Sequence, residues 1–136
     1  MIDFNKYVGI PWRCGKSSIK GADCWGIVCI VYKDLFDIEL DHFAVTSINS
    51  VDKTTMKIEK ERRDNKKWDK VEHPIRGDVV MMFSRTSERP EHVGIYLSNG
   101  WVLHSLTRET GQSEIHKIKM LNKLFKKLEF YRYVTP

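Results

Sequence analysis

The order of apolar and polar residues divides the chain into a helical first part and a strand-rich second part. Apolar residues recur at helical spacing from Ile27 to Leu35, directly after the four residues Asp23-Cys24-Trp25-Gly26. Because aspartate is a favoured N-cap, this pattern predicts a helix that follows Asp23 and ends near Phe36. A shorter helix is predicted near residues 3–7, and a partly helical stretch after residue 49.

From residue 68 onward, short apolar runs bounded by turn residues predict strands. We expect them at residues 71–72, 78–83, 92–97, 101–106 and 130–134, with a short helix near 119–126. Helices followed by strands predict the α+β class. The 136 residues are 41% hydrophobic, which is enough for one domain, 1–136, with a real core.

Cys24 lies at the predicted N-terminus of the main helix. Unpaired backbone N–H groups at that position favour the thiolate, so we expect the pKa of this thiol to be lowered. A basic, glycine-containing loop, residues 13–21, precedes it, and Gly26 leaves space beside it. Cys29 lies in an apolar context and is interpreted as a small core residue, and Cys14 has no evident role. The pattern indicates Cys24 as the candidate nucleophile.

Two histidines, His92 and His104, lie on consecutive predicted strands, and with Cys24 they indicate a cysteine hydrolase. A two-residue Asn-Gly turn would place them on opposite faces of the hairpin. A three-residue loop of residues 98–100 would instead pair Gly94 with His104 and bring both imidazoles to one face, within hydrogen-bonding reach. We predict the second arrangement. The other histidines, His42, His73 and His116, are interpreted as ordinary core or surface residues.

Four stretches of the chain resemble, in order, the NlpC family of papain-like cysteine peptidases, which cut bacterial cell-wall peptides. They are Gly9-Ile10-Pro11-Trp12 with Gly21-x-Asp23-Cys24-Trp25-Gly26-Ile27-Val28, then Arg76-Gly77-Asp78-Val79-Val80-Met81-Met82-Phe83, then His92-Val93-Gly94-Ile95-Tyr96-Leu97, and Val102-Leu103-His104-Ser105. The Pro-Trp and Asp-Cys-Trp-Gly forms resemble the branch found among tail-assembly proteins of tailed bacteriophages. The resemblance implies a papain-like fold, in which the nucleophile helix packs against an antiparallel sheet that bears both histidines.

By that resemblance, Cys24 is the nucleophile, His92 the general base and His104 the polar third member that orients the imidazole. The oxyanion hole is expected to use the Cys24 backbone N–H. The family often has a tyrosine twelve residues before the nucleophile, where this chain has Trp12. An indole N–H donates but cannot accept, so Trp12 is a candidate for binding substrate or oxyanion, or for an aromatic lid over the helix. Asp23 and Trp25 are further candidate substrate-binding or oxyanion residues.

The resemblance implies a cysteine endopeptidase that acts on peptidoglycan stem peptides, at the linkage between a D-γ-glutamyl residue and a diamino acid. Phage tail proteins are expected as further partners. Two alternatives stay open: a virion tail structural or assembly protein with little or no catalysis, and a Cys/His acyltransferase or deamidase that acts on another substrate. We expect no cofactor.

Charge and cysteine usage exclude several other classes. The net charge of +5 is concentrated in residues 53–70 and 117–127, but acidic residues are interleaved with the first run, which favours solvated faces over nucleic-acid binding. The three cysteines lack metal-type spacing and are typical of a reducing compartment, so neither a metal site nor a disulfide framework is expected. Without a signal-peptide pattern or a membrane-spanning run, we expect synthesis in the cytoplasm and, for a tail component, delivery to the cell wall by the virion.

Overall fold

The computed structural model describes residues 4–13, 17–40, 68–86, 90–106 and 111–134. The first half contains the 3₁₀ helix η1 (Asn5–Tyr7), the strands β1 (Ser17–Ser18) and β2 (Gly21–Ala22), and the helix α1 (Cys24–Phe36). The second half contains the strands β3 (Trp68–Val71), β4 (Val79–Phe83), β5 (Pro90–Ser98), β6 (Trp101–Leu106), β7 (Gln112–Lys117) and β8 (Lys127–Tyr133), with the helix α3 (Ile118–Leu124) between the last two.

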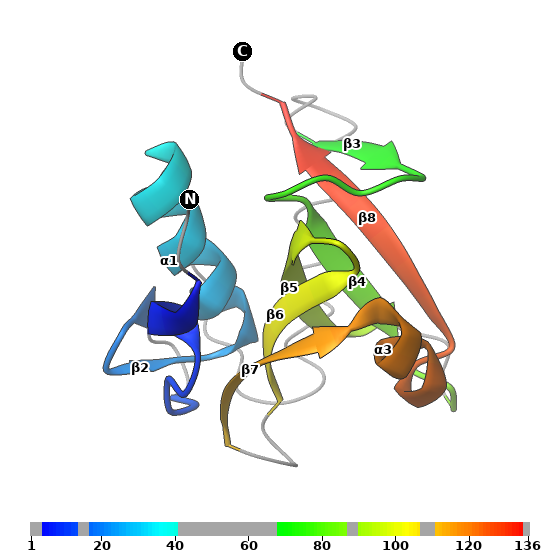
Figure 1. Ribbon diagram of the computed structural model, residues 1–136, viewed down its shortest axis with the longest axis horizontal. Helices are drawn as coiled ribbons and strands as arrows, with labels where there is room; N and C mark the ends of the chain where they lie inside the picture. The colour runs from blue at the N-terminus through cyan, green and yellow to red at the C-terminus, as the bar shows by residue number, and fades with distance from the viewer. Residues whose placement is uncertain (1–3, 14–16, 41–67, 87–89, 107–110, 135–136) are drawn as a thin grey trace.

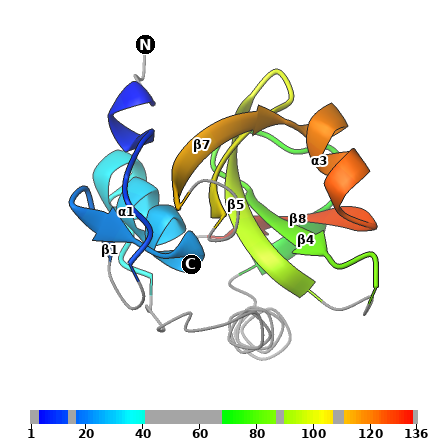
Figure 2. The same ribbon diagram turned by 90° about the horizontal axis from the view of Figure 1, so that it is seen from below.

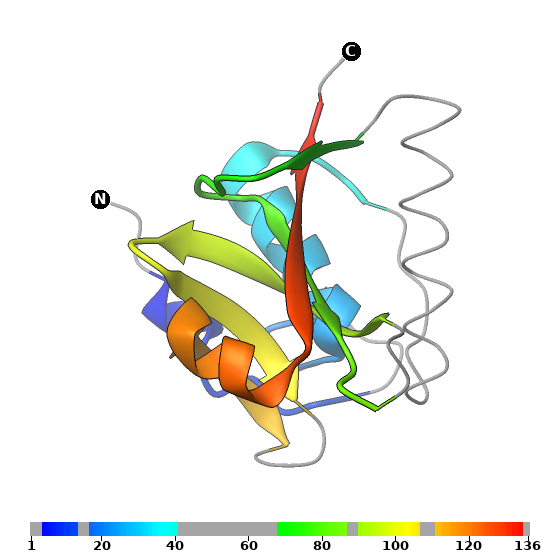
Figure 3. The same cartoon turned by 90° about the vertical axis from the view of Figure 1, so that its right-hand side faces the viewer.

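The strands of the second half form a six-stranded sheet in the order β3-β8-β4-β5-β6-β7, with every neighbouring pair antiparallel. Helix α1 covers one face of the sheet and α3 the other, as Figures 1 and 2 show. Seen from the side, α3 lies in front of the strands and α1 behind them (Figure 3). The predicted α+β, papain-like arrangement is confirmed.

The two faces of the sheet carry two hydrophobic cores. Alternate residues of β4 point to different sides: Val79 and Met81 join the core under α1, whereas Val80 and Met82 join the core under α3. Because both faces are covered, this strand is apolar along its whole length rather than alternating with polar residues. No helix of the described residues has the length and apolar composition needed to cross a membrane.

Helix α1 begins where its sequence predicts. The Asp23 carboxylate accepts a hydrogen bond of 2.7 Å from the Gly26 backbone N–H and so satisfies one of the free donors of the first turn. Residues 24–32 are all buried, because this part of the helix lies between the sheet and the β1–β2 segment. The helix ends at Asp37, which adopts a left-handed conformation with φ of 54°. The predicted helix after Asp23 is therefore confirmed, with its end at Phe36.

The hairpin of β5 and β6 differs from the prediction in its loop and agrees with it in its register. Ser98 pairs directly with Trp101, so the predicted three-residue loop is wrong and the turn consists of Asn99 and Gly100, both with positive φ. A β-bulge between Tyr96 and Ser98 adds one residue to β5 and shifts the register back by one. Gly94 therefore lies opposite His104, as predicted.

Strand β7 was not predicted, and the segment after residue 49 that we expected to be partly helical lies outside the described residues. Cys14 and His42 also lie outside them. Near the N-terminus, the described residues contain a single 3₁₀ turn, η1, where a short helix was predicted.

Candidate active site

The Cys24 thiol lies at the junction of α1 and the sheet. It is the first residue of the helix, and the residue is only 3% exposed. Backbone N–H groups of Val93, Trp25 and Cys24 itself hydrogen-bond to the sulfur. The packing of α1 against β5 thus holds the sulfur at the backbone of the residue that follows His92.

Burial controls the protonation of this thiol. Desolvation raises the pKa of Cys24 to about 12, and the negative charge of Asp23 acts in the same direction. The three backbone N–H groups favour the thiolate but are outweighed. Our expectation of a lowered pKa is therefore wrong for this closed site, because the effect of the helix N-terminus is smaller than that of desolvation. The resting site holds a thiol, which needs a base to remove its proton.

His92 and His104 form a buried pair. Nε2 of His92 lies 3.0 Å from Nδ1 of His104, and the ring centroids are 5.2 Å apart. Both residues are at most 5% exposed, and the ring of His92 also stacks on Phe125. The predicted contact between the two imidazoles is confirmed.

Burial also keeps both imidazoles neutral. It lowers the pKa of His92 to about 3, and it lowers the pKa of His104 well below its usual range, with further contributions from the neighbouring His92 and His116. Since Nε2 of His92 is engaged with His104, Nδ1 is the ring nitrogen left for the Cys24 proton. The contact between Cys24 and His92 stays a prediction.

Gly94 makes the close approach of the two strands possible at this point. A Cβ atom on this residue would lie 2.8 Å from the Leu103 backbone oxygen and 3.0 Å from Cβ of His104. The first distance is shorter than real Cβ contacts and the second is tighter than most of them, so a larger residue would shift the backbone of β6 and press on His104. The absence of a side chain at position 94 therefore positions the histidine pair.

Two further side chains, from the unpredicted strand β7, continue the row of histidines. Nε2 of His104 lies 2.8 Å from Nδ1 of His116, and Nε2 of His116 lies 3.1 Å from a carboxylate oxygen of Glu114. The structure thus places His116 beside His104, a contact that the sequence analysis did not predict. The signal that could have found it is the spacing of Glu114 and His116, which places both on one face of a strand.

Of the other candidate residues, two have clear structural tasks. Asp23 is fully buried and caps α1, and Trp25 is buried in the core between α1 and the sheet. Trp12 is different: its indole Nε1 is buried and has no hydrogen-bond partner among the described residues. Its backbone N–H donates to the Gly111 carbonyl, which places Trp12 beside the start of β7. Binding roles for these three residues stay predictions.

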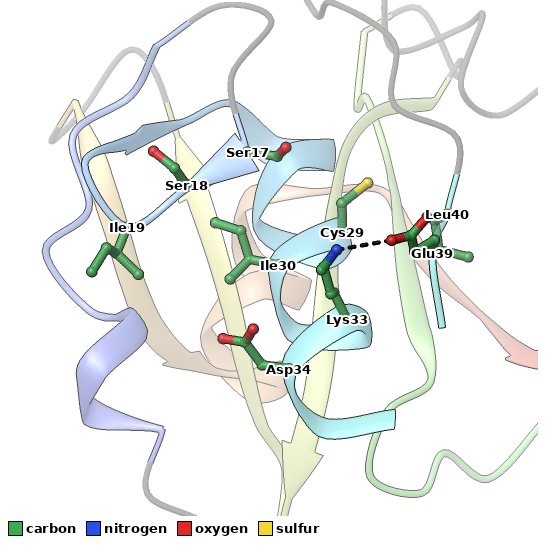
Figure 4. A pocket seen from close by; sticks show the side chains of 9 residues that line it. All are labelled: Ser17, Ser18, Ile19, Cys29, Ile30, Lys33, Asp34, Glu39 and Leu40. Carbon is green, nitrogen blue, oxygen red and sulfur yellow. Dashed lines mark hydrogen bonds and ion pairs between the residues drawn. The ribbon is translucent and has the colours of Figure 1, made fainter. Parts of the chain in front are cut away.

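A pocket of about 310 Å³ lies beside α1 and is lined by Cys29, among others, but not by Cys24, His92 or His104 (Figure 4). An ion pair of 2.8 Å between Lys33 and Glu39 lies within this pocket's lining. This pocket is therefore separate from the candidate site. Among the described residues, no cluster of three or more His, Cys, Asp and Glu side chains could hold a metal ion.

Comparison with known proteins identifies the family. A sequence model of the NlpC/P60 family matches residues 9–129, which is nearly the whole chain. The chain belongs to the NlpC/P60 family. Murein DD-endopeptidase MepH of Escherichia coli is 32% identical over 106 residues, which cover 77% of this chain and 34% of MepH. Probable endopeptidase NlpC of the same organism is 27% identical over 102 residues, which cover 73% of this chain and 54% of that protein.

The chain thus spans between a third and about half of the length of these two NlpC/P60 relatives. Solved structures of the family share its fold. The NlpC/p60 domain of peptidoglycan hydrolase SagA matches with a TM-score of 0.58 at 18% identity, covering 96% of this chain and 92% of that domain. NlpC2 from Trichomonas vaginalis matches with a TM-score of 0.63 at 17% identity, covering 97% of this chain and 44% of NlpC2.

Proposed function

We propose that this single domain, residues 1–136, is a cysteine endopeptidase that hydrolyses the stem peptides of peptidoglycan. Cys24 would be the nucleophile, His92 the general base and His104 the residue that orients His92. One observation carries the proposal: a buried hydrogen bond of 3.0 Å joins His92 to His104, and the backbone N–H of Val93, the next residue after His92, contacts the Cys24 sulfur. Membership of a family of cell-wall cysteine endopeptidases supports it.

The geometry supports a base-assisted attack. Nδ1 of His92 takes the proton of the neutral Cys24 thiol while the sulfur adds to the carbonyl carbon of the substrate amide. The resulting imidazolium then protonates the leaving amine, and the thioester that remains is hydrolysed by a water molecule that gives its proton to His92. In this mechanism Nε2–H of His92 donates to Nδ1 of His104, which leaves the Nδ1 lone pair of His92 available for the first step.

Trp12 is the candidate donor to the substrate. A buried N–H group without a partner costs the fold about 1–3 kcal/mol, so a position that retains one is a good place for a ligand acceptor. Its indole N–H has no partner among the described residues, and a carbonyl oxygen or the oxyanion would satisfy it. This supports the role in binding rather than that of an aromatic lid.

Two bonds are candidates for cleavage. The family resemblance implies the link between D-γ-glutamate and the diamino acid, whereas the relative MepH is named a murein DD-endopeptidase. Roles as a phage tail component, an acyltransferase or a deamidase rest on the sequence alone and stay predictions, as do tail proteins as partners and a virion location.

The test is mass spectrometry of muropeptides after incubation with the wild-type chain, with Cys24→Ala and with Cys29→Ala. Cys29 is a matched control, because it is a buried cysteine on the same helix that lies outside the candidate site. We expect new fragments from the wild type and from Cys29→Ala, none from Cys24→Ala, and fragment masses that identify the cut bond. Equal cleavage by Cys24→Ala would reject the proposal.

A further inference from the structure

We propose that Glu114, acting through His116 and His104, fixes which nitrogen of His92 carries the proton. Together these four side chains form what we call the histidine relay: His92, His104, His116 and Glu114. In this view Glu114 and His116 are positioning residues, since neither is placed at the reacting atoms. The inference deepens the proposed function and rests on it for the role of His92 as the base.

The register of three adjacent strands assembles the relay on one face of the sheet. His104 in β6 lies opposite Gly94 in β5 on one side and opposite Glu114 in β7 on the other. His92 and His116 each lie two residues along their strands from those positions, on the same face. The three consecutive contacts measure 3.0, 2.8 and 3.1 Å from His92 to Glu114.

The carboxylate gives this chain of contacts a direction. An ionised carboxylate can only accept hydrogen bonds, so the nitrogen of His116 that faces Glu114, Nε2, must carry the proton. When His116 carries only that one proton, its Nδ1 is an acceptor and requires a proton on Nε2 of His104. By the same reasoning Nδ1 of His104 accepts, and Nε2 of His92 donates. His92 is left with a lone pair on Nδ1, which is the state that a base for Cys24 needs.

Without Glu114, either direction would satisfy the same ring contacts. In the reversed direction every proton moves to the other nitrogen, and His92 carries its proton on Nδ1. That form cannot accept the Cys24 proton. A neutral His104, the third member of the triad, is compatible with both directions, whereas the Glu114 carboxylate at the end of the relay permits only one.

The relay also connects His92 to a negative charge, which can stabilise the imidazolium that forms during the reaction. Burial favours the neutral thiol and the neutral imidazole at rest, so an imidazolium forms only during the reaction, in buried surroundings. A charge there is stabilised by the Glu114 carboxylate through His104 and His116. The side chains of His116 and Glu114 are 23% and 29% exposed, so the carboxylate stays partly exposed at the edge strand, whereas His104 and His92 are buried.

The direct test is the nitrogen-15 NMR spectrum of the imidazole rings at neutral pH, because protonated and unprotonated ring nitrogens have well-separated shifts. In the wild-type chain, we expect His92, His104 and His116 all to carry the proton on Nε2. In Glu114→Gln, whose amide can donate as well as accept, we expect a mixture of both tautomers at His116 and His104. A proton on Nδ1 of any of the three in the wild type would overturn the relay, as would unchanged tautomers in Glu114→Gln.

Kinetics give a second readout. For Glu114→Gln we expect kcat to fall on the order of tenfold with little change in KM, and Glu114→Asp to recover most of the loss because it restores the carboxylate. Glu39→Gln is the control, since it removes the acidic partner of an exposed ion pair with Lys33 that is not part of the relay. Equal kcat in Glu114→Gln and the control would contradict the inference, as would an effect on KM alone.

The two readouts separate this inference from the proposed function. Wild-type tautomers that follow the predicted direction, in a chain that cuts no muropeptide, would support the relay and reject the substrate. Active wild-type chain with a different tautomer pattern would reject the relay and leave the peptidase proposal intact.

Discussion

Lowering the pH from 7.5 to 5 should destabilise the fold through His92. Burial lowers the pKa of this imidazole to about 3 in the folded chain, compared with an ordinary value of 6.5 in the unfolded chain. Above pH 6.5 both states hold a neutral imidazole, so His92 makes no contribution to the pH dependence. Between these two values only the unfolded chain binds the proton, so the free energy of unfolding falls as the pH falls, and the loss is complete below about pH 3.

The size of the effect follows from the two pKa values. Each pH unit within the window changes the free energy of unfolding by about 1.4 kcal/mol. At pH 5, which is one and a half units below the unfolded value, His92 alone should cost about 2 kcal/mol. That is a substantial part of the roughly 5–15 kcal/mol that stabilises a typical domain. His104 acts in the same direction, because its pKa is also lowered.

Urea unfolding at pH 7.5 and pH 5.0 tests this for the wild type, His92→Gln and His73→Gln. Glutamine at position 92 keeps a donor toward His104 but does not titrate, and His73 is an exposed histidine that serves as the control. When the pH is lowered from 7.5 to 5.0, we expect the free energy of unfolding to fall by about 2 kcal/mol more in the wild type and in His73→Gln than in His92→Gln. If all three chains lost the same amount, the buried, neutral state of His92 would be refuted.

Two further predictions concern single side chains around the site. Trp12→Phe removes a buried donor that has no partner among the described residues. We expect kcat for muropeptide cleavage to fall on the order of tenfold to a hundredfold, while the thermal unfolding midpoint is unchanged or higher. A normal rate would exclude Trp12 as a donor to the substrate. Gly94→Ala brings a Cβ atom to 2.8 Å from the Leu103 carbonyl oxygen. It should destabilise the chain by about 1–3 kcal/mol in urea unfolding and lower kcat as His104 moves, and wild-type values for both would show that the strands can separate freely.

The parts of the site that depend on local sequence could be predicted. The cap of α1 is one such part, because Asp23 hydrogen-bonds to a residue only three positions away. The shared face of His92 and His104 was also predicted, but for a reason that was partly wrong. A β-strand has a period of two, so the bulge between Tyr96 and Ser98 has the same effect on the register as the loop residue that we expected.

The remaining features depend on contacts between distant segments. Strand β7 has the sequence Gln-Ser-Glu-Ile-His-Lys, with one strongly apolar residue, and it shows too little alternation to indicate a strand. It pairs with β6 and also hydrogen-bonds to residues 9–10, and the pairing with β6 brings Glu114 and His116 to His104. The pKa of Cys24 was predicted in the wrong direction for the same reason, because the helix N-terminus is visible in the sequence and the burial of the thiol is not.

Burial and the relay are connected. A closed site keeps Cys24 as a thiol and His92 neutral, so the chemistry depends on a proton transfer between them and on the tautomer of His92 at that moment. Neutral imidazoles adjust readily to either tautomer, and a pair of them has no preferred direction. A carboxylate placed directly beside His92 would set the direction but would have to be desolvated together with the site, at a high energetic cost. Placing it two histidines away, on the edge strand β7, sets the direction while the charge remains partly exposed. The buried site and the distant carboxylate are therefore two parts of one arrangement: the intervening histidines fix the tautomer of His92, which an adjacent buried carboxylate could do only with a larger desolvation penalty.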